Sequence, residues 1–148
     1  YYSLDGYIHV NIQQREPVLR VLTGEGYYVD RDGRVMPLSS KFTSRVVVAT
    51  GDINKKFACE KLGPFAMKLK NEPFWDAYIE QLVVRSNEDV VMIPKVGDFR
   101  IVLGKVDDCE ARLEKLMLFL KDGITKKGWN RYKEINLKFD NQVVCVRK

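Results

Sequence analysis

The sequence predicts an α+β fold, namely a mostly antiparallel β domain with flanking helices. Short stretches of β-branched and apolar residues alternate with polar ones at the period of a half-buried strand, and turn residues such as Asp-Gly separate them. Two longer segments instead space their apolar residues three and four apart, as amphipathic helices do. A chain of 148 residues can bury one substantial core, so a folded domain is expected.

Strand signals dominate the first 50 residues. Residues 1–22 are expected to form a hairpin with an Asp-Gly turn, interrupted at Pro17 because proline cannot donate to the ladder. A second hairpin is predicted over residues 27–36, and a buried strand over residues 45–50. The glycines between the two hairpins indicate a flexible junction. We therefore place a domain boundary there, which divides the chain into residues 1–24 and 25–148.

The middle of the chain combines helical material with a meander. Residues 54–70 are predicted to be helical with an interruption at Gly63, after which Pro64 can open a new helix. Residues 73–75 are expected to form a turn that carries two aromatic side chains. Three short strands with tight turns between them then predict an antiparallel meander over residues 79–103.

A helix is predicted to begin at Asp107. Asp107 would be its N-cap and Glu110 would reach back to complete a capping box. The apolar stripe that indicates the buried face consists of Leu113, Leu116, Met117 and Leu120, and the helix is expected to end at Gly123. The carboxylates at its start are the common complement of a helix N-terminus, so we do not interpret them as a metal site.

The function is predicted to lie in the last stretch, residues 134–147. Ile135, Leu137 and Phe139 alternate with polar residues, and a β-branched run follows them. A strand near a terminus is often an edge strand, whose unpaired backbone groups are either protected or used to receive a partner strand. No charge and no proline interrupts residues 142–146, which favours use over protection.

Motifs for catalysis or metal binding are absent from the sequence. There is no Ser-His-Asp, Cys-His, Walker or HExxH pattern, and the single histidine, His9, falls on the polar side of a predicted strand. The cysteines Cys59, Cys109 and Cys145 lie far apart, without the spacing of a zinc site. We therefore expect no catalytic residue, no metal ligand and no cofactor.

The charge and the start of the chain give further expectations. The net charge of +5 leaves a nucleic-acid or anionic-lipid binding module as the alternative function, although 25 basic residues are interleaved with 20 acidic ones. No apolar run is long enough to cross a bilayer. Because the sequence starts without Met and in the middle of a strand pattern, we expect it to be part of a longer protein.

Several stretches, in this order, resemble a known bacterial family. They are Ile8–Val18, which contains Pro17; Tyr28–Val35, which is similar to a Tyr-x-Val-Asp-x-x-Gly-x-Val hairpin; the strands Ile79–Val84 and Phe99–Gly104; and the last strand, Ile135–Val144. Together they resemble the extracytoplasmic region of the cell-division family FtsQ/DivIB, most closely its Bacteroidetes type. The resemblance covers nearly the whole chain.

The resemblance implies an architecture and a location. Family members have one N-terminal transmembrane helix, followed by a POTRA domain and a β domain outside the membrane. Residues 1–24 would then be the closing hairpin of a truncated POTRA-like domain, and residues 25–148 an FtsQ-type β domain. The implied location is the inner membrane, single-pass, with this region in the periplasm. A POTRA-type chaperone is a rival that also adds strands, but such domains usually occur as repeats, and none is seen.

The resemblance also implies a non-enzymatic scaffold that supports septal cell-wall synthesis. Its partners would be FtsB-like and FtsL-like proteins, with an FtsB-like strand added to the C-terminal strand. The partner-binding residues would be Ile135, Lys138, Phe139, Asp140, Asn141, Gln142, Val143 and Val144. The family's Arg-Tyr pair falls on Lys138 and Phe139. Lysine cannot bind a carboxylate in the bidentate way of arginine, and phenylalanine lacks a hydroxyl, so a less polar contact is expected.

Overall fold

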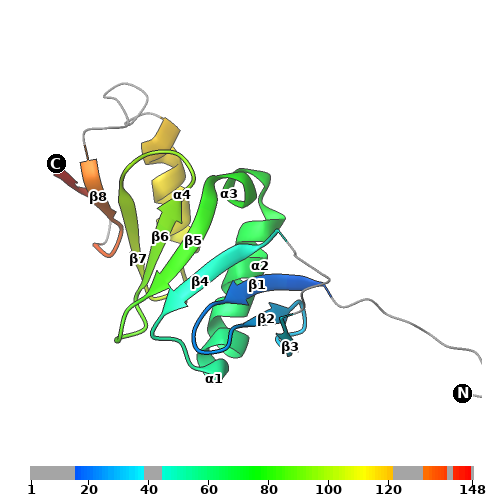
Figure 1. Cartoon of the computed structure of the whole chain (residues 1–148). Coiled ribbons are helices and arrows are strands. Elements are labelled where there is room, and N and C mark those ends of the chain that lie inside the picture. The colour runs from blue at the N-terminus through cyan, green and yellow to red at the C-terminus, as the bar shows by residue number, and fades with distance from the viewer. Residues whose placement is uncertain (1–15, 39–44, 122–131, 140–141, 148) are drawn as a thin grey trace, which may run out of the picture.

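The chain forms one mixed β-sheet with helices against one of its faces (Figure 1). The computed structural model describes residues 16–38, 45–121, 132–139 and 142–147. Within them the strands are β1 (Pro17–Val21), β2 (Tyr27–Asp30), β3 (Val35–Pro37), β4 (Val47–Gly51), β5 (Ile79–Val84), β6 (Val90–Pro94), β7 (Arg100–Gly104), β8 (Tyr132–Asn136) and β9 (Val144–Arg147). The helices are α1 (Lys55–Phe57), the π-helical turn η1 (Ala58–Leu62), α2 (Gly63–Asn71), α3 (Pro73–Tyr78) and α4 (Glu110–Phe119).

The strand order is β3-β2-β1-β4-β5-β6-β7-β8-β9. The predicted second hairpin is confirmed as β2–β3, and the predicted meander is confirmed as β5–β6–β7. The sheet is less antiparallel than predicted, because β1–β4, β4–β5 and β7–β8 pair in parallel. Helical crossovers explain two of these pairs, since α1–α3 connect β4 to β5 and α4 connects β7 to β8. The fold class is therefore α+β with a mixed sheet.

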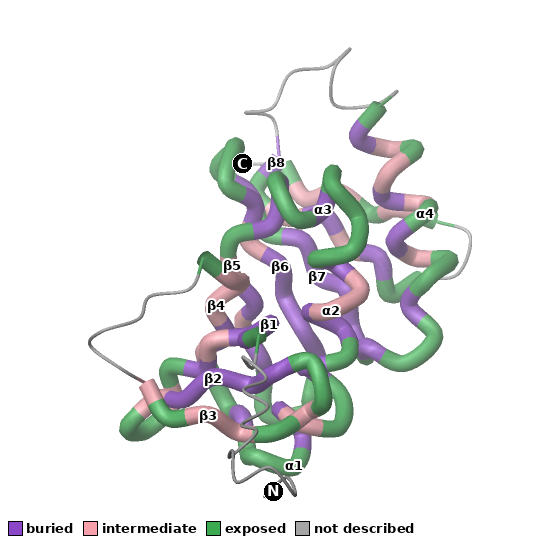
Figure 2. The backbone as a smooth tube through the Cα atoms, turned by 90° about the vertical axis from the view of Figure 1, so that its right-hand side faces the viewer, coloured by how far each residue is buried: buried purple, intermediate pink, exposed green. Residues whose placement is uncertain are grey.

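One row of paired side chains, on neighbouring strands, forms a continuous part of the core across the sheet. The paired residues of this row are Tyr27, Val21, Ala49, Leu82, Met92, Ile101, Ile135 and Cys145, from β2 to β9. From Val21 to Ile135 every member is fully buried, in the same cluster as Leu62 of η1 and Leu116 of α4. Full burial of one large apolar side chain stabilises a protein by about 1.5–3 kcal/mol. Figure 2 shows β6 and β7, at the centre of this layer, buried along most of their length.

The helical segment between β4 and β5 is continuous at Gly63, where an interruption was predicted. Asn54 is the N-cap, since its Oδ1 accepts a hydrogen bond from the Phe57 backbone N–H at 2.7 Å. The π-helical turn η1 then runs directly into α2, and Pro64 occupies the first turn of α2. The predicted turn at residues 73–75 is instead the start of α3. Proline at the first position of a helix explains this difference.

The helix after β7 begins at Glu110, later than predicted, and Cys109 is its N-cap without a side-chain cap. The capping box was wrong because both carboxylates bind lysines from the other helical segment. Asp107 Oδ1 lies 2.8 Å from Lys61 Nζ, and Glu110 binds Lys68. These pairs hold η1 and α2 beside the start of α4, on one face of the sheet. The predicted helix end, Gly123, lies outside the described residues.

The first strand belongs to the same sheet as the rest of the chain. β1 pairs with β2 on one side and with β4 on the other, and the boundary predicted after residue 24 falls in the turn between β1 and β2. The first arm of the predicted N-terminal hairpin, with His9, lies outside the described residues. The division into residues 1–24 and 25–148 stays a prediction.

Candidate partner-binding edge

The stretch predicted as one terminal strand is a hairpin of two strands. β8 lies between β7 and β9, and β9 is the last strand of the sheet. β8 ends at Asn136 and is followed by Leu137, whose side chain is fully buried and whose backbone N–H donates to the Val102 carbonyl at 2.9 Å. The chain then returns antiparallel, so that Val144 pairs with Asn136. Among the described residues β9 forms this edge of the sheet, in agreement with the predicted edge strand.

Residues 137–143, here called the β8–β9 connection, are tied to the fold at their start. Lys115 of α4 donates from Nζ to the Phe139 carbonyl at 2.7 Å and to the Leu137 carbonyl at 3.4 Å. The Lys138 backbone N–H donates to Asn136 Oδ1 at 2.9 Å. The start of this connection is therefore held from α4 and from β8.

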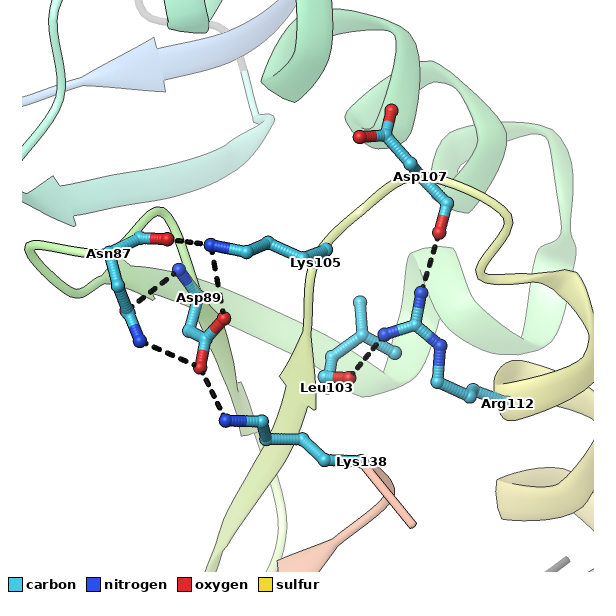
Figure 3. Close-up of polar contacts among 7 residues, drawn as sticks. All are labelled: Asn87, Asp89, Leu103, Lys105, Asp107, Arg112 and Lys138. Carbon is cyan, nitrogen blue, oxygen red and sulfur yellow. Dashed lines mark hydrogen bonds and ion pairs between the residues drawn. The ribbon is translucent and has the colours of Figure 1, made fainter. Parts of the chain in front are cut away.

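The side chain of Lys138, which is 45% exposed, reaches toward the turn between β5 and β6. Its Nζ lies 2.7 Å from Oδ2 of Asp89, whose side chain is only 4% exposed (Figure 3). Lys105 Nζ lies 3.5 Å from the other carboxylate oxygen, and Asn87 donates to Oδ2 at 3.1 Å. Lys138 thus has an internal ion-pair partner, whereas the sequence suggested that it grips another protein.

The remaining predicted residues differ in their exposure. Phe139 is 52% exposed and Val144 is 36% exposed, and Gln142 is exposed beside them. Val143 is partly buried and packs against the core. Ile135 is fully buried, so its side chain supports the strand and cannot reach a partner. Asp140 and Asn141 lie outside the described residues.

A comparison with protein families now adds to this geometry. A family described as FtsQ/DivIB, C-terminal related, matches residues 16–146, which is most of the chain. The chain belongs to this FtsQ/DivIB-related family. A comparison with curated proteins finds no match. The predicted resemblance is therefore confirmed at the level of the family.

Membership of the FtsQ/DivIB-related family carries a general function. The family consists of non-enzymatic, membrane-anchored scaffolds of cell division, with other division proteins as partners. Among the described residues of this member, no helix is long and apolar enough to cross a membrane. In the same residues, no three His, Cys, Asp or Glu side chains are grouped as metal ligands.

A hollow of about 650 Å³ lies away from this edge of the FtsQ/DivIB-related chain, where β4 and β5 begin beside α2 and α3. Its charged lining residues have both signs: Arg45, Lys70, Lys95, Asp76 and Glu80. None of the predicted partner-binding residues lines it. Its mixed charge favours neither an anionic nor a cationic ligand.

Sequence reasoning missed Asp89 and Lys115, which organise the β8–β9 connection of this family member. Asp89 belongs to a predicted turn, where an acidic residue is ordinary, and Lys115 belongs to the polar side of a predicted helix. Their contacts span 49 residues for Asp89 with Lys138 and 24 for Lys115 with Phe139. No local pattern signals contacts over such distances.

The ion pair predicts an acid-sensitive contribution to stability. The hydrogen bond from Lys138, together with the charges of Lys138 and Lys105, lowers the pKa of Asp89 against the opposing effect of burial. The contribution is therefore complete above the unfolded-state pKa of about 3.9 and is lost as the pH falls through the lower folded-state value. At neutral pH, Asp89→Asn should lower the free energy of unfolding by about 1–2 kcal/mol.

Denaturant unfolding of the wild type and the Asp89→Asn variant across the acidic range measures this contribution. The difference between the two proteins should shrink toward zero as the carboxyl of the wild type becomes protonated in acid. A difference that stays constant down to pH values well below the ordinary carboxyl pKa would contradict the role assigned to this ion pair.

Proposed function

We propose that this chain is a non-enzymatic divisome scaffold that receives a β-strand of an FtsB-like partner along β9. The observation that supports the proposal most directly is the position of β9 at the end of the sheet, next to the exposed side chains of Phe139 and Val144. In strand addition, backbone hydrogen bonds supply affinity and neighbouring side chains supply specificity.

The direction of the backbone groups in β9 follows from the neighbouring strands. The N–H of Leu137 points to β7, and successive residues of a strand point their N–H groups to opposite sides. The backbone of Asn136 therefore points to β9, and that of its paired residue Val144 points back to β8. A partner strand would align along the other side of β9, away from β8.

The side chains next to this edge favour an apolar contact. Phe139 offers a half-exposed ring without a hydroxyl, and Val144 lies nearby on the strand itself. The Lys138 ammonium is already paired with Asp89. The partner segment is accordingly expected to place apolar side chains against Phe139 and Val144.

The wider context belongs to the same proposal. The protein would act in the inner membrane as a single-pass protein with this region in the periplasm, bind FtsL-like as well as FtsB-like proteins, and support septal cell-wall synthesis. Residues 1–24 would be the closing hairpin of a POTRA-like domain. The nucleic-acid or anionic-lipid alternative has less support, because the 25 basic residues are interleaved with 20 acidic ones along the chain.

Substitution of Cys145 by proline tests strand addition. Cys145→Pro interrupts β9, along which the partner strand would pair, and we expect about tenfold weaker binding of the cognate FtsB-like peptide in calorimetry, equivalent to about 1.4 kcal/mol. Cys145→Ala is the matched control, since it removes the thiol but keeps the N–H, and its affinity should equal that of the wild type. Val144→Pro instead removes an N–H that points to β8, so this variant should lose stability.

Affinities are compared only between variants that are folded, and thermal unfolding of each variant checks that it is folded. Wild-type affinity in a folded Cys145→Pro protein would refute strand addition at β9. Binding of DNA or acidic vesicles by the wild type, weakening steeply with added salt, would instead support the alternative function.

A further inference from the structure

A nearly buried carboxylate joins three segments that are distant in the sequence. Asp89, in the turn between β5 and β6, accepts hydrogen bonds from Asn87 and Lys138 and also faces Lys105, at the end of β7 (Figure 3). Its side chain is 4% exposed, and a carboxylate is costly to bury unless it is paired and hydrogen-bonded. The pairing with Lys138 therefore fixes the β8–β9 connection to a second part of the sheet.

The path of the Lys138 side chain depends on a glycine. Gly104, the last residue of β7, has a φ of +90°, and a Cβ added there would lie 3.1 Å from Lys138 Cγ and 3.2 Å from Arg112 Nη1. Arg112 donates to the carbonyls of Leu103 and Asp107, both at 2.6 Å, and so holds this end of β7 in place (Figure 3). The Lys138 side chain thus passes close to Gly104 on its way to Asp89.

The same connection is held from α4. Lys115 binds the carbonyls on either side of Lys138, those of Leu137 and Phe139. Residue 138 is therefore fixed through its side chain by Asp89, while its two neighbours are fixed through their backbones by Lys115. The next side chain, that of Phe139, is left 52% exposed beside the edge strand.

We propose that Asp89 is a positioning residue for partner recognition, which acts by holding Lys138 so that Phe139 is presented beside β9. This inference rests on the proposed function. An aromatic side chain whose backbone is already ordered loses less conformational entropy on binding, so affinity rises without a new contact. Asp89 itself touches no partner in this scheme, and the role of Lys138 is internal.

A double-mutant cycle separates positioning from general destabilisation. We expect Asp89→Asn to weaken binding of the cognate FtsB-like peptide about fivefold, equivalent to about 1 kcal/mol. In a Phe139→Ala background the same substitution should change affinity less than about twofold, since there is no ring left to position. Lys138→Arg, which keeps the ion pair, should bind like the wild type. Lys61→Gln, which breaks the unrelated pair with Asp107, should also leave affinity unchanged.

Amide hydrogen exchange without the partner gives an independent readout. In Asp89→Asn the amides of Lys138, Phe139 and Gln142 should exchange at least about fivefold faster, while the amides of β6 and β7 keep their rates. The positioning role would be overturned if Asp89→Asn weakened peptide binding equally in the wild type and in the Phe139→Ala protein. It would also be overturned if the amides of the β8–β9 connection exchanged at unchanged rates in Asp89→Asn. If the wild type fails to bind the peptide at all, the proposed function fails, and exchange still decides whether Asp89 orders the connection.

Discussion

Replacement of Phe139 by alanine is expected to weaken the affinity for the FtsB-like strand by at least about thirtyfold. Aromatic side chains that become buried at the centre of an interface often contribute 2 kcal/mol or more, and 2 kcal/mol corresponds to about thirtyfold in affinity. Phe139 is 52% exposed, and the backbone carbonyl of the same residue is fixed by Lys115. Its ring is thus accessible to a partner while its position is restricted.

Calorimetry with the cognate peptide measures this effect, and two variants serve as controls. Phe139→Tyr keeps the ring and should bind within about threefold of the wild type, since the added hydroxyl points toward solvent or partner. Val96→Ala removes another exposed apolar side chain, 62% exposed, in the turn between β6 and β7 at the opposite end of the sheet. If Phe139→Ala binds as tightly as Val96→Ala, the ring is not part of the interface.

Replacement of Gly51 by alanine is expected to lower the free energy of unfolding by about 3 kcal/mol or more. Gly51 ends β4 with a φ of +106°, where a side chain is strained. An added Cβ would also lie 2.2 Å from the carbonyl oxygen of Val84, the paired residue on β5. That oxygen accepts the Asp52 N–H at 2.9 Å, so relief of the clash would disturb the central β4–β5 pair.

Gly24→Ala provides the matched comparison for this effect. Gly24 also has a positive φ, +67°, but an added Cβ would meet nothing within 4 Å. Its cost should therefore be limited to backbone strain of about 1 kcal/mol. Denaturant unfolding of both variants separates the cost of backbone strain from the cost of the steric clash with Val84. Equal losses of stability would show that the clash is relieved without disturbing the sheet.

The parts of the fold that the sequence predicted are those with local causes. The hairpin at β2–β3 and the meander β5–β6–β7 follow from alternation and turn residues within a few positions of each other. The buried stripe of α4 was also predictable, since Leu113, Leu116 and Leu120 share one helical face and are all buried. In each case the pattern and the structure that it specifies lie in the same short segment.

The parts that were missed depend on contacts between distant segments. Parallel pairs need a crossover, and nothing in the residues of β4 indicates that β1 and β5 are its neighbours. The capping box failed because Lys61 and Lys68 bind the two carboxylates expected to take part in it. One strand was predicted across residues 134–147 because the apolar pattern continues through Leu137, where the chain leaves the sheet.

The candidate site shows the same division. That an edge strand lies late in the chain could be predicted from the strand pattern in residues 134–147. The different environments of the adjacent residues Lys138 and Phe139 could not be predicted from the sequence. The strand pattern places Phe139 on the apolar side and Lys138 on the polar side, yet the Phe139 ring is exposed and the Lys138 ammonium is paired with the nearly buried Asp89. The structure therefore assigns different tests to the two residues.

The buried row that crosses the sheet sets a rule for the sequence of any strand added at β9. The row ends at Cys145, which is only partly buried and follows Ile135 in register. A residue laid beside Cys145 would join the layer beneath the helices, and its neighbours would face the opposite side. A matching ligand should therefore be apolar at the position beside Cys145 as well as beside Val144, and a charged residue placed beside Cys145 should weaken recognition.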